Sequence, residues 1–247
     1  KKQLIALMFA LVPALASAAG GSGYHLDEAN IDLTDKAALQ DGARTFVNYC
    51  MGCHSAQYQR YERVATDLGI PEQLMLDNLV FTEGTLIGDH MKNGMRGEDA
   101  KTWFCAAPPG LTLVARVRGT DWLYTYLRSF YVDPARPLGV NNILFPDVGM
   151  PHVLWELQGL QEAKFDVVTD EHGHEHKTFA GFALVKPGEM SVDKYDAMVR
   201  DMVAFLTYVG EPGQLDRQRL GIYVLLFLAV FFVVAYLLKK EYWKDVH

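Results

Sequence analysis

Cysteine is scarce in this chain: three of its 247 residues are Cys50, Cys53 and Cys105. Three thiols cannot form the disulfide framework of a small secreted scaffold. The fold must therefore depend on a packed core, which a composition of 50% hydrophobic residues can supply. We expect Cys105, the thiol outside the first pair, to be a buried and reduced side chain.

Positive charge is also in short supply. The chain has 23 lysines and arginines against 30 acidic residues, and its formal net charge is −7. An acidic surface repels nucleic acid and suits a basic protein partner. Any soluble acidic domain would share this composition, so the charge argues against nucleic acid without identifying the partner.

The most informative motif is Cys50-Met51-Gly52-Cys53-His54. Two thiols three positions apart, followed directly by histidine, form the attachment site of a c-type haem. The thiols form thioethers with the porphyrin vinyl groups, and an imidazole nitrogen of His54 binds the iron. A zinc-binding or redox-active C-x-x-C is the alternative, but it needs a second ligand pair or a βαβ setting, and both are lacking. The motif predicts one covalently attached haem c.

The beginning of the chain has the three-part pattern of a secretory signal peptide. Lys1 and Lys2 precede an apolar run from Leu4 to Leu15, and Ala16-Ser17-Ala18 follows as a small-residue cleavage site. We expect residues 1–18 to be a cleaved leader. Retention of the leader as a second membrane helix is the alternative.

A second apolar run, Leu220–Leu238, contains no charged residue. At ~1.5 Å per residue a helix of this length spans about 28 Å, close to the hydrocarbon thickness of a bilayer. We therefore predict a transmembrane anchor at 220–238. Export would place the domain at 19–215 in the bacterial periplasm. The tail at 239–247 would be cytoplasmic, as its lysines also suggest.

Helical periodicity and capping residues predict helices in several segments, which are 35–49, the stretch after Pro71, 85–103, 111–131 and 191–209. Gly42 would allow close packing of the first helix against the last, for which Ser191 is the predicted N-cap. Pro108 and Pro109 must separate the helices at 85–103 and 111–131.

Two short strands, 165–169 and 179–185, are predicted to form a β-hairpin. Their connection, 170–178, carries three histidines at alternate positions, which are His172, His174 and His176. We expect a solvated turn there, with a surface metal site as the alternative.

The irregular loop 134–151 contains Gly149-Met150-Pro151. Pro151 favours an extended backbone at Met150, and Gly149 allows the chain to approach a flat cofactor closely. Haem iron held by histidine on one face accepts methionine on the other in electron carriers. The residues alone leave the choice of ligand open, because Met95 is the first of several rivals, the others being Met75, Met91, Met190, Met198 and Met202.

From about Gly42 to the anchor, the chain resembles the bacterial cytochrome c1 family, the haem subunits of the cytochrome bc1 complex (ubiquinol–cytochrome c reductase). The resemblance is carried by Cys50-Met51-Gly52-Cys53-His54, Ala107-Pro108-Pro109-Gly110-Leu111-Thr112, Arg116-Val117-Arg118, Gly149-Met150-Pro151 and the single C-terminal span. Gly110 and Thr112 depart from the family's usual Asp and Ser. Cys105 has no partner for the disulfide of some bacterial relatives.

The resemblance implies a mainly α, class I-like cytochrome c domain with insertions, a small β-hairpin and one C-terminal transmembrane helix. It implies that His54 and Met150 are the two iron ligands and that Arg118 lies near a haem propionate. A surface ion pair is the alternative role for Arg118. The implied site holds no residue that makes or breaks substrate bonds.

The resemblance also implies a place in the bacterial inner membrane and a one-electron relay inside an oxidoreductase complex. The implied partners are cytochrome b, the Rieske iron–sulfur protein and a soluble or membrane-tethered cytochrome c. Other interpretations are an anchored cytochrome that feeds a terminal oxidase, a haem enzyme or gas sensor with an open iron position, and a haem that serves only as a folding core.

Overall fold

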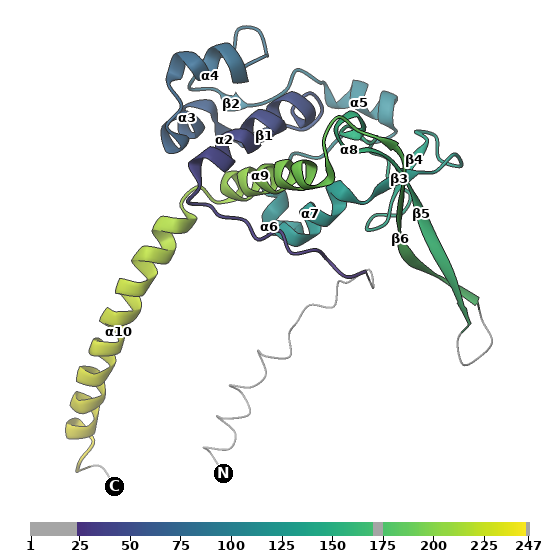
Figure 1. Cartoon of the computed structure of the whole chain (residues 1–247). Helices are drawn as coiled ribbons and strands as arrows, with labels where there is room; N and C mark the ends of the chain where they lie inside the picture. Colours follow the sequence, from purple (N-terminus) through teal and green to yellow (C-terminus); the bar gives the residue numbers. More distant parts are fainter. Residues whose placement is uncertain (1–23, 170–174, 246–247) are drawn as a thin grey trace.

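The computed structural model describes residues 24–169 and 175–245, so the predicted leader lies outside the described residues. A helical domain is flanked by a long two-stranded ribbon, and one long helix leaves the domain (Figure 1). The helices are α2 (Lys36–Thr45), α3 (Tyr61–Leu68), α4 (Glu72–Leu79), α5 (Gly97–Phe104), α6 (Val114–Arg118), α7 (Thr120–Arg128), α8 (Trp155–Gln158), α9 (Val192–Gly210) and α10 (Gln214–Tyr242), with a π-helical turn, Phe46–Cys50, directly after α2.

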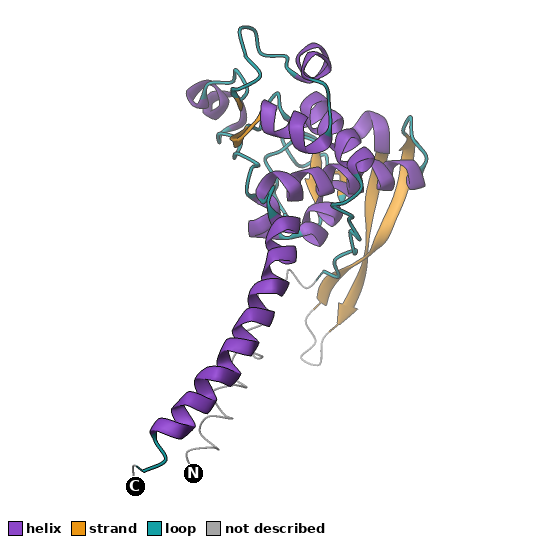
Figure 2. Cartoon of the chain, turned by 90° about the vertical axis from the view of Figure 1, so that its left-hand side faces the viewer, coloured by secondary structure: helices purple, strands orange, loops and turns teal. Residues whose placement is uncertain are grey.

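The described strands form antiparallel pairs, β1 with β2, β3 with β4 and β5 with β6. Their bounds are β1 (Ala56–Arg60), β2 (His90–Met91), β3 (Phe130–Val132), β4 (Val140–Asn142), β5 (Gly159–Thr169) and β6 (Glu175–Pro187). The prediction of a mainly α domain with a β-hairpin is confirmed. Only the β5–β6 ribbon is long, and it lies along one side of the helical body (Figure 2).

The centre of the domain is the crossing of α2 and α9, as predicted. Asp35 caps α2 by accepting hydrogen bonds from the backbone of Ala37 and Ala38 at 3.0 and 3.1 Å. A Cβ atom at Gly42 would overlap the carbonyl oxygen of Asp201, so glycine permits this close approach. Ser191 occupies the N-cap position of α9, but its side chain makes no capping hydrogen bond.

The prediction of one helix over 85–103 is wrong. Turns and the short strand β2 occupy most of this segment, and helix forms only from Gly97 to Phe104. Gly88 and Gly94 explain the difference, because each glycine costs a helix about 1 kcal/mol relative to alanine. The segment forms β2 instead, which pairs with β1 beside the Cys50–His54 motif.

Cys105 is exposed, so the prediction of a buried thiol is wrong. The residue follows α5 in the left-handed conformation, with φ of +62°. It comes directly before Ala106–Gly110, where two prolines prevent further helix and carry the chain across the surface. No helix face remains there to bury the side chain.

The single helix predicted at 111–131 is two helices and a strand. Gly119, with φ of +90°, separates α6 from α7, and the chain becomes β3 at Phe130. Few residues other than glycine adopt this conformation. The break turns Arg118 onto the same side as the start of α7, where its guanidinium lies over the ring of Trp122.

The hairpin is longer than predicted, with β5 and β6 of 11 and 13 residues. His176, expected in the connection, pairs with Val168, while His172 and His174 lie outside the described residues. The side chain of Gln161 donates to the carbonyl oxygens of Arg128 and Phe130 at 2.9 and 2.7 Å. These bonds fix the base of the ribbon to the domain.

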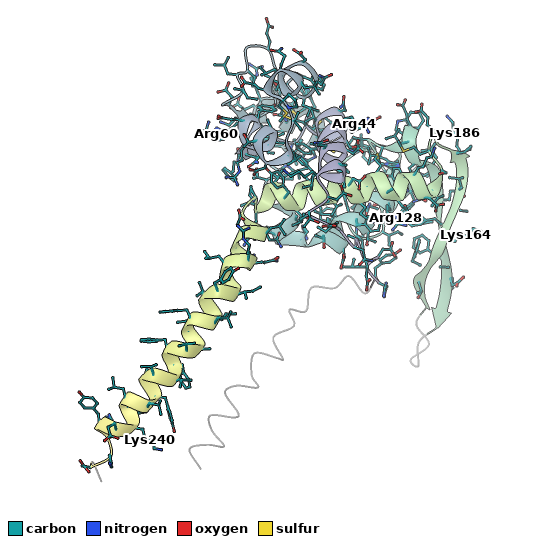
Figure 3. The ribbon with its side chains drawn as sticks, turned by 60° about the vertical axis from the view of Figure 1, so that its left-hand side comes forward. Arg44, Arg60, Arg128, Lys164, Lys186 and Lys240 are labelled. Carbon is teal, nitrogen blue, oxygen red and sulfur yellow. The ribbon has the colours of Figure 1, made fainter. Side chains whose placement is uncertain are left out.

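Helix α10 covers the predicted anchor and is 29 residues long. Its apolar side chains project without any other element packed against them (Figure 3). The helix is long and apolar enough to cross a membrane. A soluble domain does not leave so long an apolar surface exposed, so α10 is best explained as a membrane anchor.

Candidate haem-binding site

The Cys50–His54 segment is one compact turn at the end of the π-helical residues. The amide groups of Cys53 and His54 both donate to the carbonyl oxygen of Cys50, at 3.1 and 2.9 Å. Cys50 is buried, Cys53 is half-buried, and both are free thiols. Burial raises the pKa of the Cys50 thiol to about 12. The turn therefore brings two free thiols and an imidazole to the same place.

The ring of His54 is oriented by the Pro-Pro segment. Its Nδ1 lies 2.7 Å from the carbonyl oxygen of Pro109. A carbonyl can only accept, so Nδ1 carries the proton and Nε2 keeps its lone pair. Burial lowers the pKa of His54, which favours the neutral ring that a metal ion requires. A second bond, from the amide of Leu111 to the carbonyl of Ser55 at 2.9 Å, links the same two segments.

Arg118 lies at the C-terminal end of α6, on a segment that continues directly from Pro109 and Leu111. Its guanidinium carbon is 4.9 Å from the ring centre of Trp122 and 5.9 Å from that of Phe145. Phe145 belongs to the irregular loop that leads to Met150. The side chain of Arg118 therefore lies between α7 and the methionine loop, with its charge accessible to solvent.

Met150 is half-buried against α7. Its Sδ is 3.4 Å from the hydroxyl oxygen of Tyr126. Tyr126 in turn stacks on Trp122, with ring centres 4.8 Å apart and an interplanar angle of 11°. Met150 and Arg118 thus contact neighbouring residues of one helix face. His54 is connected to this group through the segment from Pro109 to Arg118.

The rival methionines fall into two groups. Met75, Met91 and Met202 are fully buried core residues, while Met190 and Met198 are half-buried against the same core. Met202 Sδ lies 3.7 Å from Cys50 Sγ in this core. Buried methionines usually serve as packing residues.

Met95, the first alternative ligand, is different. It lines a hollow of about 150 Å³ together with Cys53, Pro108 and Gly110. Pro108 and Gly110 flank the proline whose carbonyl contacts His54, so Met95 and His54 lie beside the same segment. Met150 lies on a separate segment, against α7.

These residues fit a c-type haem. The structure offers two free thiols in one turn, a neutral imidazole with Nε2 unprotonated, and a half-buried thioether on a separate segment. These are the attachment groups and axial donors of an electron-transfer haem. Trp122 and Tyr126 were not predicted as site residues. Their spacing of four on one helix was the available signal, but core packing gives the same spacing.

His152 follows the methionine loop and is buried. Its ring stacks on Phe130 with centres 5.0 Å apart and an interplanar angle of 3°. Burial lowers the pKa of His152 to about 4, so the ring is neutral at pH 7. This agrees with a structural role, in which the stacked ring fixes the chain two residues after Met150.

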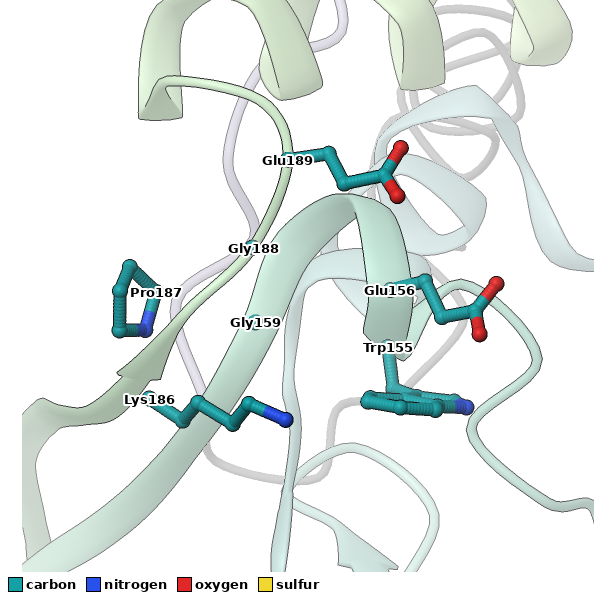
Figure 4. Close-up of a pocket in the computed structure, with 7 residues that line it drawn as sticks. All are labelled: Trp155, Glu156, Gly159, Lys186, Pro187, Gly188 and Glu189. Carbon is teal, nitrogen blue, oxygen red and sulfur yellow. The ribbon is translucent and has the colours of Figure 1, made fainter.

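A second hollow, of about 280 Å³, lies at the base of the ribbon (Figure 4). Lys186 and Trp155 both line this hollow, and the ammonium of Lys186 lies 5.3 Å from the ring centre of Trp155. The residues that line it come from α8, the start of β5, the end of β6 and the two residues that follow β6. None belongs to the Cys50–His54 motif or the methionine loop. This hollow is separate from the candidate haem site.

Among residues 24–169 and 175–245, no group of three or more His, Cys, Asp or Glu side chains could hold a metal ion. The alternative of a zinc site at the cysteine motif therefore has no support within these ranges. The alternative metal site at His172, His174 and His176 falls on side chains that are not described.

Comparison with known proteins gives consistent results. A model of the Cytochrome C1 family matches residues 185–246. The chain is 55% identical to cytochrome c1 of Allochromatium vinosum over 100% of both chains. It is 43% identical to a Nitrosomonas europaea protein named ammonia monooxygenase gamma subunit, over 99% of this chain and 98% of that one. It is 26% identical to cytochrome c1 of Rhodospirillum rubrum, over 86% and 83% of the two chains.

Proposed function

Because the chain belongs to the cytochrome c1 family, we propose that it carries single electrons from a Rieske iron–sulfur protein to a cytochrome c. Members of this family are the haem subunits of ubiquinol–cytochrome c reductase, an oxidoreductase complex. The observation that carries the proposal is the hydrogen bond from His54 Nδ1 to Pro109 within a Cys-x-x-Cys-His turn, because it leaves Nε2 free for iron.

Each site residue has a defined role in this relay. A bound haem c supplies the one-electron couple. Cys50 and Cys53 would hold it through thioethers, and His54 Nε2 and Met150 Sδ would bind its iron. The Pro109 carbonyl makes His54 a stronger donor by accepting its other ring proton. With His54 and Met150 both binding the iron, a bound haem would favour electron transfer over substrate or gas binding.

Arg118 would balance the charge of the haem, and the anchor would fix the position of the domain. The guanidinium of Arg118, which lies over the rings of Trp122 and Phe145, would neutralise a haem propionate. Helix α10 would keep the domain beside cytochrome b at the periplasmic face of the bacterial inner membrane. The excess of acidic residues would steer a basic cytochrome c toward the domain.

Purification in mild detergent tests the function directly. We expect cytochrome b and a Rieske protein to co-purify with the chain, as identified by mass spectrometry of the subunits. Addition of quinol should then reduce the haem of this chain, and removal of the Rieske protein should abolish that reduction. Co-purification with a terminal oxidase or a monooxygenase instead would contradict the proposal. The printed name of the Nitrosomonas europaea relative makes the monooxygenase a necessary comparison.

Substitution of the proposed sixth ligand tests the site. We expect Met150→Leu to abolish the near-infrared sulfur–iron charge-transfer band of the oxidised protein. The midpoint potential should fall by on the order of 0.1 V, because axial ligands set haem potentials over a range of ~0.8 V. The matched control is Met95→Leu, which should leave both properties unchanged. A Met150→Leu protein with the band and potential of the parent would exclude Met150 as a ligand.

A further inference from the structure

Tyr126 is the residue that contacts the sulfur of Met150. Its hydroxyl oxygen lies 3.4 Å from Met150 Sδ. A thioether sulfur has no proton to give, so the phenol is the donor in this contact. A phenol is protonated at neutral pH, so the hydroxyl can donate.

The tyrosine ring is held in place from two sides. It stacks on Trp122 and meets the edge of Phe130, with ring centres 5.2 Å apart and an interplanar angle of 70°. The backbone carbonyl of Tyr126 accepts a hydrogen bond from the buried side chain of Asn142 at 2.8 Å. Asn142 Oδ1 also accepts from the amide of Leu144 at 3.0 Å, which ties the methionine loop to α7. The hydroxyl and the sulfur are therefore positioned by one connected set of contacts.

We propose that Tyr126 is a positioning residue that tunes the potential of the haem by donating a hydrogen bond to the sulfur of Met150. The inference rests on the proposed function, in which Met150 is the sixth ligand. A donated hydrogen bond draws electron density from the sulfur, and the sulfur then donates less to the iron. Ferric iron depends more on that donation than ferrous iron, so the bond favours the reduced state and raises the midpoint potential.

The test is Tyr126→Phe in the full, haem-loaded chain. Phenylalanine keeps the ring that stacks on Trp122, so the fold and the position of Met150 should be retained. At a fixed ambient potential we expect the ratio of oxidised to reduced haem to rise about three- to tenfold. This factor corresponds to the net free energy that one hydrogen bond usually contributes. At 59 mV per tenfold for one electron, the midpoint should fall by about 30–60 mV.

A second measurement follows the sulfur–iron charge-transfer band against pH. Without the hydrogen bond Met150 should bind ferric iron more strongly, so the band of Tyr126→Phe should persist to higher pH than that of the parent. The matched control is Tyr61→Phe. The hydroxyl of Tyr61 donates to Met51 Sδ at 3.6 Å, a contact of the same chemistry on a methionine that is not a ligand. Its removal should leave the potential unchanged.

The outcomes separate this inference from the proposed function. If Tyr126→Phe keeps the band and its potential is equal to or higher than that of the parent, the tuning role of Tyr126 is excluded while Met150 ligation stands. If the parent itself shows no sulfur–iron band, ligation by Met150 fails and the inference fails with it. A lower potential with an intact band supports both.

Discussion

The hydrogen bond between His54 and Pro109 determines which nitrogen of the imidazole can bind iron. Its acceptor is a backbone carbonyl, so side-chain substitution at position 109 cannot remove it directly. The two residues are 55 positions apart, and the cysteine motif alone does not reveal the contact. The C-x-x-C-H spacing predicts that a histidine ligand exists, whereas the fold determines its tautomer and orientation.

The carboxyl group of Asp201 should make the free energy of unfolding depend on pH. Burial, together with the nearby carboxylate of Asp41, raises the pKa of Asp201. Between the unfolded pKa and this raised value the folded state binds more protons than the unfolded state, so the free energy of unfolding decreases as pH rises. We expect Asp201→Asn to stabilise the domain at pH 7 by less than about 1 kcal/mol. The gain should vanish below pH ~4.

The measurement is denaturant unfolding of the haem-loaded chain in detergent at a series of pH values, followed by circular dichroism. The control is Asp216→Asn on α10, whose side chain is 78% exposed. If Asp201→Asn does not raise the free energy of unfolding at pH 7, or raises it equally at pH 4 and pH 7, the charged Asp201 carboxylate does not destabilise the fold.

At the scale of elements, the crossing of α2 and α9 places the haem motif. Helix α2 leads directly into Cys50, and Gly42 allows it to approach the backbone of α9. An added Cβ would overlap the carbonyl oxygen of Asp201 and lie 2.8 Å from Cβ of Phe205. We expect Gly42→Ala to lower the free energy of unfolding by about 2–3 kcal/mol, because helix backbones must separate to admit the methyl group.

The same unfolding measurement checks this prediction, with Gly97→Ala as the matched control. Gly97 begins α5, and no heavy atom lies within 4 Å of a Cβ built there. Alanine should be neutral or slightly stabilising at this position. Equal stability of the Gly42→Ala and parent proteins would show that the two helices are not closely packed at this point.

Elements with a clear local signal were predictable. Helices α2 and α9 combine capping positions with an apolar stripe, and both were found near their predicted bounds. The segment 85–103 and the break at Gly119 were missed because an apolar pattern predicts helix even where glycines interrupt it. The ribbon was underestimated because its base is held by bonds from Gln161 to β3, a contact between distant segments.

Part of the candidate site was predictable because it also has a clear local signal in the sequence. Cys50, Cys53 and His54 form a contiguous motif, which a sequence displays completely. Met150 and Arg118 needed the resemblance to a family, because isolated methionines and arginines usually pack or face solvent. The residues that connect them, Trp122 and Tyr126, come together only through the fold of α7 against the methionine loop.

At the scale of the whole molecule, the export signal and the lysines that follow Leu238 predict one orientation of α10 in the membrane, with the domain in the periplasm. Cys105 is exposed, whereas Cys50 and Cys53 would be blocked by thioethers. A membrane-impermeant maleimide added to intact spheroplasts should therefore label the chain at Cys105 alone. Cys105→Ser should abolish labelling. A cysteine placed in the tail of that variant by Lys244→Cys should react only after permeabilisation.

The reverse pattern, with the tail labelled in intact spheroplasts and Cys105 protected, would contradict a periplasmic domain. Labelling at Cys50 or Cys53 would show that the thiols are not joined to haem. The experiment thus tests the direction of the anchor and the state of the cysteines in one preparation.

One haem should be bonded to this chain through Cys50 and Cys53. Mass spectrometry of the intact chain, purified from membranes and extracted with acidified organic solvent, measures this bond. We expect a mass increased by one haem, and Cys50→Ala combined with Cys53→Ala should remove the increase. A chain whose haem is extracted by the solvent, or whose mass shows no haem at all, would contradict this expectation.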